Sequence, residues 1–171
     1  MSRIMTRSKI MFDPLAPEPE LIHIADIAHA LSMLCRANGH FHSFHSVGQH
    51  SIHCMKEARA RGYSRRLQLA CLLHDASEAY LSDVTRPVKQ VLPAYLEIEG
   101  PLQDAIWLKY LGTPLTAEEN RQVFQIDDDM GLFTLLAAQT CHTHGSTHRI
   151  QVGVLVAHDE NLAALADQLH Q

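Results

Sequence analysis

Apolar residues recur at helical spacing along much of the chain. From Ile24 they fall at i, i+3, i+4 and i+7, which predicts a first helix ending near Arg36, before the helix-stopping Gly39. Ser46, with Gln49 three residues later, has the form of a capping box. The pattern therefore predicts a second helix that begins at this serine, after a polar, histidine-rich loop.

Two more helices follow from the same spacing. Gly62 ends the second helix, and Ser64 can cap a third. The apolar stripe of the third helix runs through His74 as far as Tyr80. After a loop that contains a proline, residues 94–111 predict a fourth helix with a glycine directly behind it.

The C-terminal part of the chain holds one clear helix and a less regular remainder. Thr116 and Glu119 form a second capping box, which opens a helix over 118–139. A last helix is predicted over 159–169, while the apolar segment 150–156 fits either a helix or a strand. Because other signals for strands are weak, the fold class we infer is all-α, a bundle of about six helices.

The length of 171 residues fits one domain, since single domains commonly span about 100–200 residues. Three prolines within residues 12–20 predict an extended conformation there. We divide the predicted single domain, 1–171, into an extended leading segment (1–22), the helices that carry the chemistry (24–138) and a C-terminal segment (139–171).

Composition and charge restrict the classes of partner. A hydrophobic fraction of 46% with 19% charged residues is typical of a folded globular domain. Fourteen Lys and Arg against nineteen Asp and Glu give a formal charge of −5, which argues against long nucleic acid and anionic membrane surfaces. A small anionic ligand held by a few local cations fits this balance.

Two features predict a cytoplasmic location without membrane insertion. No apolar run is long enough to cross a bilayer, and the basic residues 1–9 have no apolar signal segment behind them. The cysteines are scattered without a CxxC pair, which predicts reduced thiols rather than a disulfide framework or a zinc ribbon; they are Cys35, Cys54, Cys71 and Cys141.

The chain has thirteen histidines, more than its tyrosines, phenylalanines and tryptophan together, so position must decide which of them matter. His74 and Asp75 stand side by side, and Glu78 follows at i+4 from the histidine. On one helix face these groups would share the surface used by the preceding leucines, and burying them without partners would cost roughly 1–3 kcal/mol each. A divalent cation would satisfy them; the alternative is a helix end that simply meets solvent.

Asp127 is the best second acid. It falls within the apolar stripe of its helix, whose other members are Val123, Ile126, Met130, Phe133 and Ala137. Asp128 and Asp129 point away from that stripe, so we expect both on a solvated face.

His50 is the preferred second histidine ligand, because it stands in the first turn of a capped helix in an apolar context, unlike His45 or His53. Two other groups of histidines remain open alternatives. His40, His42 and His45 could be loop residues near a substrate; His142, His144 and His148 imitate a metal cluster in a Gly/Ser/Thr-rich run.

The order of His50, then His74-Asp75, then Asp127 resembles the HD-domain superfamily of metal-dependent phosphohydrolases. The stretch HDASEAYLSDVTRPVK at 74–89 is similar to the bacterial 5′-deoxynucleotidase and small dNTP triphosphohydrolase branch, and VGQHS at 47–51 to its first histidine motif. The resemblance covers residues 36–89 and, more loosely, the helix at 120–138.

This resemblance implies a set of site residues. His50, His74, Asp75 and Asp127 would hold one divalent ion, either a transition metal (Mn, Co, Zn, Fe or Ni) or Mg. Glu78 and Asp83 would serve the attacking water and the leaving group, while Arg36, Lys89 and Arg86 would bind phosphate. Ser82 occupies a position where the family usually has glycine, and Ala37 one where an aromatic residue is common.

The implied activity is hydrolysis of small (deoxy)nucleotides, releasing phosphate from a deoxynucleoside monophosphate or triphosphate from a deoxynucleoside triphosphate such as dATP. The family also implies a homo-oligomer, for which the apolar segment 150–156 could supply an interface. No histidine lies between Asp75 and Asp127, which disfavours the two-metal phosphodiesterases of the superfamily. The alternatives are a metal- and nucleotide-binding module without catalysis and a structural helical protein with a histidine-rich surface.

Overall fold

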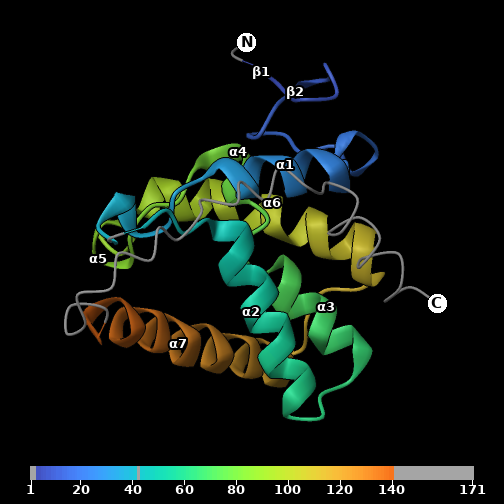
Figure 1. Ribbon diagram of the computed structural model, residues 1–171. Coiled ribbons are helices and arrows are strands. Elements are labelled where there is room, and N and C mark those ends of the chain that lie inside the picture. Colours follow the sequence, from blue (N-terminus) through green and yellow to red (C-terminus); the bar gives the residue numbers. More distant parts are fainter. Residues whose placement is uncertain (1–2, 42, 141–171) are drawn as a thin grey trace.

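Helices account for most of the structure, a computed structural model that describes residues 3–41 and 43–140 and the side chains as far as residue 132. The longer helices are α1 (Ile24–Met33), α2 (Val47–Ala60), α3 (Arg65–Leu73), α6 (Pro93–Leu111) and α7 (Ala117–Thr140). Short helical turns join them: η1 (Pro19–Leu21), η2 (Arg36–Gly39), α4 (Glu78–Leu81) and α5 (Arg86–Lys89). The predicted all-α fold class is confirmed, and Figure 1 shows the arrangement.

The capping residues expected from the sequence are all found at helix starts. Ser46 Oγ accepts from the N–H of Gln49, while Gln49 Oε1 accepts from the N–H of Ser46, so α2 opens with a complete capping box. Thr116 and Glu119 form the same reciprocal pair before α7. Ser64 accepts from Leu67 N–H at the start of α3.

Two helices end earlier than the apolar pattern predicts. α1 stops at Met33 rather than near Arg36, because the chain turns extended at Leu34 and Cys35, and the latter forms an isolated bridge with Ser46. α3 stops at Leu73 rather than continuing to Tyr80, and residues 74–77 form turns. The predicted shared helix face for His74, Asp75 and Glu78 is therefore wrong, although all three side chains still line one pocket.

Two loops also contain more structure than expected. The leading segment holds an antiparallel pair of short strands, β1 (Ile4–Met5) and β2 (Met11–Phe12). Phe12 anchors this hairpin, since it is fully buried and its ring centroid lies 4.4 Å from that of Tyr80. The loop around Pro87 contains the single turn α5, in which the proline occupies a first-turn position where no N–H is needed.

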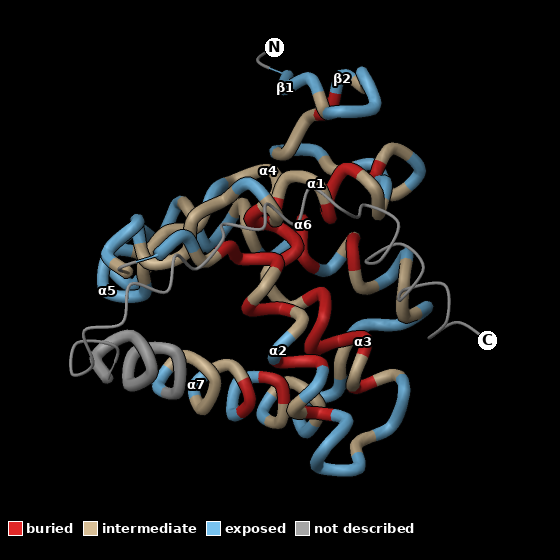
Figure 2. The backbone as a smooth tube through the Cα atoms, viewed as in Figure 1, coloured by how far each residue is buried: buried red, intermediate tan, exposed pale blue. Residues whose placement is uncertain are grey.

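The core lies around α2 and α3, where Figure 2 shows many of the buried positions. One apolar cluster joins α1, α2, α3 and α6 through residues such as Ile27, Leu72 and Ile106. A second joins α2 and α3 to the first half of α7 through residues such as Val123 and Ile126. The second cluster therefore holds α7 against α2 and α3.

Several predictions fall on parts that the structure does not describe. These are His42, the segment 150–156, the helix over 159–169, Cys141 and the cluster of His142, His144 and His148; the side chains of Phe133 and Ala137 are also outside the described set. Among the described residues, none of the helices combines the length and apolarity needed to cross a bilayer.

Candidate functional site

A pocket of about 660 Å³ opens between η2, the segment 74–89, α6 and α7. Its lining mixes charged and apolar side chains. The charged ones include Arg36, Asp75, Glu78, Asp83, Arg86, Lys89 and Asp127, and the apolar ones include Phe41, Leu96, Trp107, Val123 and Phe124. Such a lining suits a ligand with an anionic part and a flat or apolar part.

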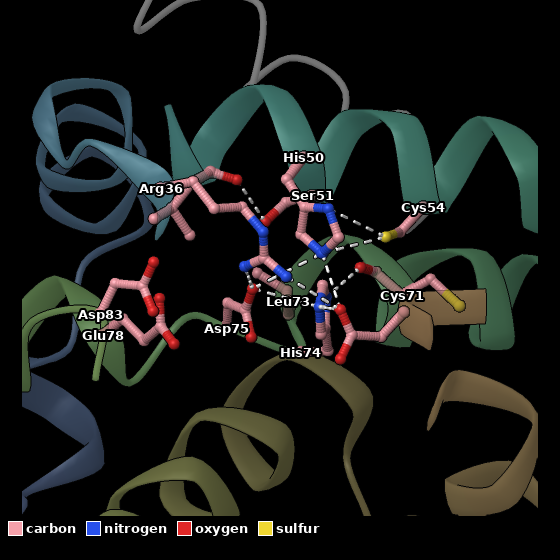
Figure 3. A network of polar contacts seen from close by, with 12 residues as sticks. Arg36, His50, Ser51, Cys54, Cys71, Leu73, His74, Asp75, Glu78 and Asp83 are labelled. Atoms are coloured by element: carbon pink, nitrogen blue, oxygen red, sulfur yellow. Dashed lines mark hydrogen bonds and ion pairs between the residues drawn. The ribbon is translucent and has the colours of Figure 1, made fainter. Parts of the chain in front are cut away.

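Four side chains from three separate parts of the chain converge beside this pocket. Three of them, His74, Asp75 and Asp127, line it, whereas His50 is fully buried and not part of the lining. His50 Nε2 lies 2.9 Å from Asp127 Oδ1 and 3.8 Å from Asp75 Oδ2. His74 Nε2 lies 3.2 Å from the same Asp75 oxygen and 3.5 Å from the same Asp127 oxygen. The four residues that the family resemblance names as metal ligands are thus brought together, as Figure 3 shows for the three from α2 and the 74–75 turn.

A backbone carbonyl fixes the ring orientation of His74. Its Nδ1 lies 2.8 Å from the backbone carbonyl of Cys71, so Nδ1 carries the proton and donates it to that oxygen. Nε2 then faces the carboxylates, and among the described residues this buried atom has no hydrogen-bond partner. A histidine held in this way presents Nε2 as a metal ligand, and the carbonyl fixes its tautomer.

Arg36 makes contact with the same two carboxylates. Its Nη1 donates to Asp75 Oδ2 at 3.0 Å and its Nη2 to Asp127 Oδ1 at 3.1 Å. Arg86 approaches from α5 and donates to the other oxygen of Asp127 at 3.1 Å, while also pairing with Asp128 at 2.6 Å. Both predicted phosphate-binding arginines therefore stand at the carboxylates that the resemblance names as metal ligands.

The closeness of these charged groups shifts their pKa values. Burial alone would raise the pKa of Asp75, but the charges of His74 and Arg36 lower it well below its usual range. Burial likewise opposes ionisation of Asp127, yet the bond from His50 and the charge of His74 hold its pKa far below normal. Burial works against a charge on His74 too, but the carboxylates raise its pKa well above normal. Two ionised carboxylates thus stand at the pocket, where Arg36 and Arg86 already pair with them.

The pKa of His50 is shifted in the opposite direction. Burial lowers it, and the hydrogen bond to Asp127 offsets only part of that shift. A neutral imidazole at neutral pH is the form that binds metals. The residues present fit a divalent ion once His74 gives up the proton that its raised pKa retains: two imidazoles and two carboxylates, with their donor atoms 2.9–3.8 Å apart for the four His–Asp pairs.

Cys54 is a further candidate ligand that the sequence reasoning missed. The ligand atoms of His50, Cys54 and His74 lie within 4.8 Å of one another, so this buried group could hold a metal ion. The Cys54 sulfur is 3.4 Å from His50 Nε2, one helical turn along α2. Burial raises the pKa of its thiol to about 12, which keeps the sulfur protonated in the absence of a metal. The i, i+4 spacing from His50 was the signal available in the sequence.

The two predicted catalytic acids lie together on the other side of Asp75 (Figure 3). Glu78 is buried, and its Oε2 has no hydrogen-bond partner among the described residues. Burial and the nearby charges of Asp75 and Asp83 raise the pKa of Glu78 to about 9, so it carries a proton at neutral pH. Asp83 Oδ2 accepts from the N–H of Ala37 at 3.3 Å, and so also supports the turn that bears Arg36.

Lys89 lies in the pocket wall, but it already has a partner. Its Nζ is 2.6 Å from Glu99 Oε1 and 3.9 Å from Glu78 Oε1, and it stands over the ring of Tyr95. Glu99 on α6 is another residue that the sequence reasoning missed. Its ion pair holds Lys89, the predicted phosphate-binding lysine, against α6.

The remaining predicted residues are exposed to solvent or lie beside other side chains. Asp128 is exposed, and Asp129 is about half exposed and paired with Arg61. His45 and His53 lie near each other, with ring centroids 5.8 Å apart, and neither is part of the four-residue group. Burial and neighbouring cationic groups lower the pKa of His45 to about 4.

Comparison with known proteins gives relatives without an assigned activity. No family model matches the chain. The uncharacterized protein YfdR of Escherichia coli K12 is 38% identical over 89 residues, which cover 52% of this chain and 47% of that protein. An uncharacterized protein of Rhodobacter capsulatus is 39% identical over 104 residues, covering 57% and 53%. The chain spans about half the length of these curated relatives.

Proposed function

We propose that the chain is a metal-dependent phosphohydrolase that acts on small (deoxy)nucleotides. The observation that carries the proposal is the convergence of His50, His74, Asp75 and Asp127 beside the buried acid Glu78. Such a group has the donor set and charge for one divalent ion, which would polarise a phosphoryl oxygen and acidify a water. The HD-domain resemblance of residues 36–89 agrees with this reading.

The chain's own residues would divide the remaining work. Arg36 and Arg86, at the edge of the carboxylate pair, would neutralise phosphate charge, with Lys89 as a third cation in the wall. Glu78 would hold a proton at Oε2 and donate it to the departing oxygen, since its pKa of about 9 keeps it protonated at pH 7. The apolar lining, with Trp107 and Phe124, would take the base.

The test is a product screen of the purified chain, reconstituted in turn with Mn²⁺, Co²⁺, Zn²⁺, Ni²⁺, Fe²⁺ and Mg²⁺, against deoxynucleoside mono- and triphosphates. Nucleoside plus phosphate identifies a nucleotidase, whereas nucleoside plus intact triphosphate identifies a triphosphohydrolase. Asp127→Asn should abolish turnover and metal binding together. Asp128→Asn, which alters the exposed neighbour, should retain both, and absence of product with every metal would contradict the proposal.

A second candidate is a binding module without catalysis. It is favoured by the engagement of all three pocket cations with carboxylates, since Arg36, Arg86 and Lys89 each already have an acidic partner. Against it stands Glu78, because a buried acid without a hydrogen-bond partner has little use in a site that only binds. Stoichiometric nucleotide binding with no product after long incubation would favour the module.

A further inference from the structure

The α-helical hydrogen-bond pattern is interrupted where His74 and Asp75 stand, and one side chain from α6 bridges the break. In an uninterrupted helix the N–H of Ser77 would donate to the carbonyl of Leu73. Here Ser77 N–H donates instead to Gln103 Oε1 at 3.1 Å, and Gln103 Nε2 donates to the Leu73 carbonyl at 2.9 Å. The Gln103 amide has thus replaced one helical hydrogen bond by two of its own.

All three partners are buried, with 2% of Leu73, 2% of Ser77 and 7% of Gln103 exposed. Buried backbone groups without partners are among the least tolerated features of a folded protein. Without the amide, the segment would have to re-form the helix or leave the Ser77 N–H unsatisfied, while the Leu73 carbonyl would keep only the bond from Ala76 N–H. Gln103 therefore stabilises the break itself, beyond its packing in α6.

The two candidate ligands of this segment, His74 and Asp75, stand within the break. Here Ala76 N–H donates to Leu73 O and Glu78 N–H to Asp75 O, both at 3.0 Å and each spanning only three residues. In this conformation His74 Nε2 lies 3.2 Å from Asp75 Oδ2 and 3.5 Å from Asp127 Oδ1.

We propose that Gln103 is a positioning residue, whose amide holds the 74–77 turn in the conformation that aims His74 and Asp75 at one point. As far as it concerns metal binding, this inference rests on the proposed function. Gln103 also lines the pocket, although it is remote in sequence from the residues that it orders.

The test compares Gln103→Met with Ile106→Val, a substitution at a fully buried apolar position three residues along the same helix. Hydrogen exchange measured on the metal-free proteins reports the turn directly. We expect amides of residues 74–81 to exchange about tenfold faster or more in Gln103→Met, with α2 and α7 changed much less. In Ile106→Val, exchange of these residues should rise no more than in the rest of the core.

A second readout is the affinity for Co²⁺, followed by its visible absorption without any substrate. Gln103→Met should bind Co²⁺ about 10–100-fold more weakly than the unmodified chain, and Ile106→Val within twofold of it. Gln103→Glu is nearly isosteric and keeps the acceptor for Ser77, so it serves if the methionine variant does not fold. It loses the donor to Leu73 and should show the same direction of change in both readouts.

The two claims fail separately. Unchanged exchange of residues 74–81 in the folded Gln103 variants would overturn the positioning role, whatever metal is bound. Faster exchange in a chain that binds no divalent ion would uphold the positioning role and overturn the proposed function. Normal Co²⁺ affinity in a Gln103 variant with a loosened turn would contradict the link between the turn and the ligands.

Discussion

Ser82 holds a backbone conformation that is normally reserved for glycine. Its φ of 74° and ψ of 160° lie in a region where a side chain costs roughly 1–3 kcal/mol. The HD-domain family that the chain resembles usually has glycine at this position. The turn before Asp83 therefore has a backbone conformation typical of glycine, although the residue is a serine.

Replacing this serine should therefore stabilise the protein. We expect Ser82→Gly to raise the free energy of unfolding by about 0.5–2 kcal/mol, since relief of strain exceeds the added entropy of an unfolded glycine. Urea denaturation measures the change. The control is Ser64→Gly, at a position with φ of −57° whose side chain caps α3. That control should be neutral or destabilising, and an equal gain in both would argue against strain at Ser82.

Glu78 gives the stability of the protein a dependence on pH. Its pKa rises from an ordinary 4.5 to about 9, chiefly through burial, so folding favours the protonated form. The contribution of Glu78 to stability is then full below about pH 4.5 and declines as pH rises towards 9, with a limiting slope of about 1.4 kcal/mol per pH unit.

Urea midpoints measured with a chelator between pH 5 and 8 test this contribution. Glu78→Gln, a neutral mimic of the protonated acid, should flatten the decline relative to the unmodified chain. Glu97→Gln, at an exposed position on α6, should leave the slope unchanged. The raised pKa of His74 gives a decline of the same sign above about pH 6.5, so some slope remains in the variant. A slope as steep as that of the unmodified chain would show that Glu78 is not a source of the decline.

Arg36 and a divalent ion would compete for the same carboxylate oxygens of Asp75 and Asp127. We therefore expect Arg36→Met to bind Co²⁺ on the order of tenfold more tightly, because hydrogen bonds to charged groups contribute about 1.5–3 kcal/mol each. The same variant should bind phosphate-bearing ligands more weakly. Arg61→Met, which removes an arginine paired with Glu57 and Asp129, is the control. Unchanged metal affinity in Arg36→Met would exclude the competition.

At the scale of elements, α2 positions His50 through its first turn. The capping box of Ser46 and Gln49 satisfies two backbone groups there, and the chain enters the helix from the bridge with Cys35. Ser46→Ala should lower the free energy of unfolding by about 1 kcal/mol and increase hydrogen exchange in residues 47–51. Thr116→Ala, at the equivalent cap of α7, should cost a similar amount without affecting exchange at His50.

The elements also show why sequence could predict some features and not others. Caps such as that of α2 depend on residues three apart, so they can be recognised locally. The end of α3 depends on Gln103, which is 26 residues from Ser77 and 30 from Leu73. Apolar periodicity continues past the break, because the following residues are buried too. The family resemblance indicated the four clustered residues, and the i, i+4 spacing of Cys54 from His50 was a local signal, but Glu99 and Gln103 became visible only through tertiary contacts.

At the scale of the whole molecule, the four candidate ligands come from α2, the turn after α3, and α7. A metal held by them would tie together elements that join both apolar clusters, so binding should stabilise the entire fold. Co²⁺ at a hundredfold excess over its dissociation constant should add about 2.7 kcal/mol to the free energy of unfolding. Calorimetry with and without the ion measures this gain, which Asp127→Asn should abolish and Asp128→Asn preserve.

The bridge between Cys35 and Ser46 has a consequence for how this molecule can vary. Arg36 N–H donates to the carbonyl of His45 at 2.8 Å, and Val47 N–H donates to that of Leu34 at 3.0 Å, so the intervening loop is closed at its base. These two hydrogen bonds at the base of the loop, and not the length of the loop, then set the positions of Arg36 and His50. Doubling a loop closed in this way adds only about 0.6 kcal/mol of entropy. This loop is therefore a natural place for evolution, or an engineer, to graft new recognition sequence onto unchanged chemistry.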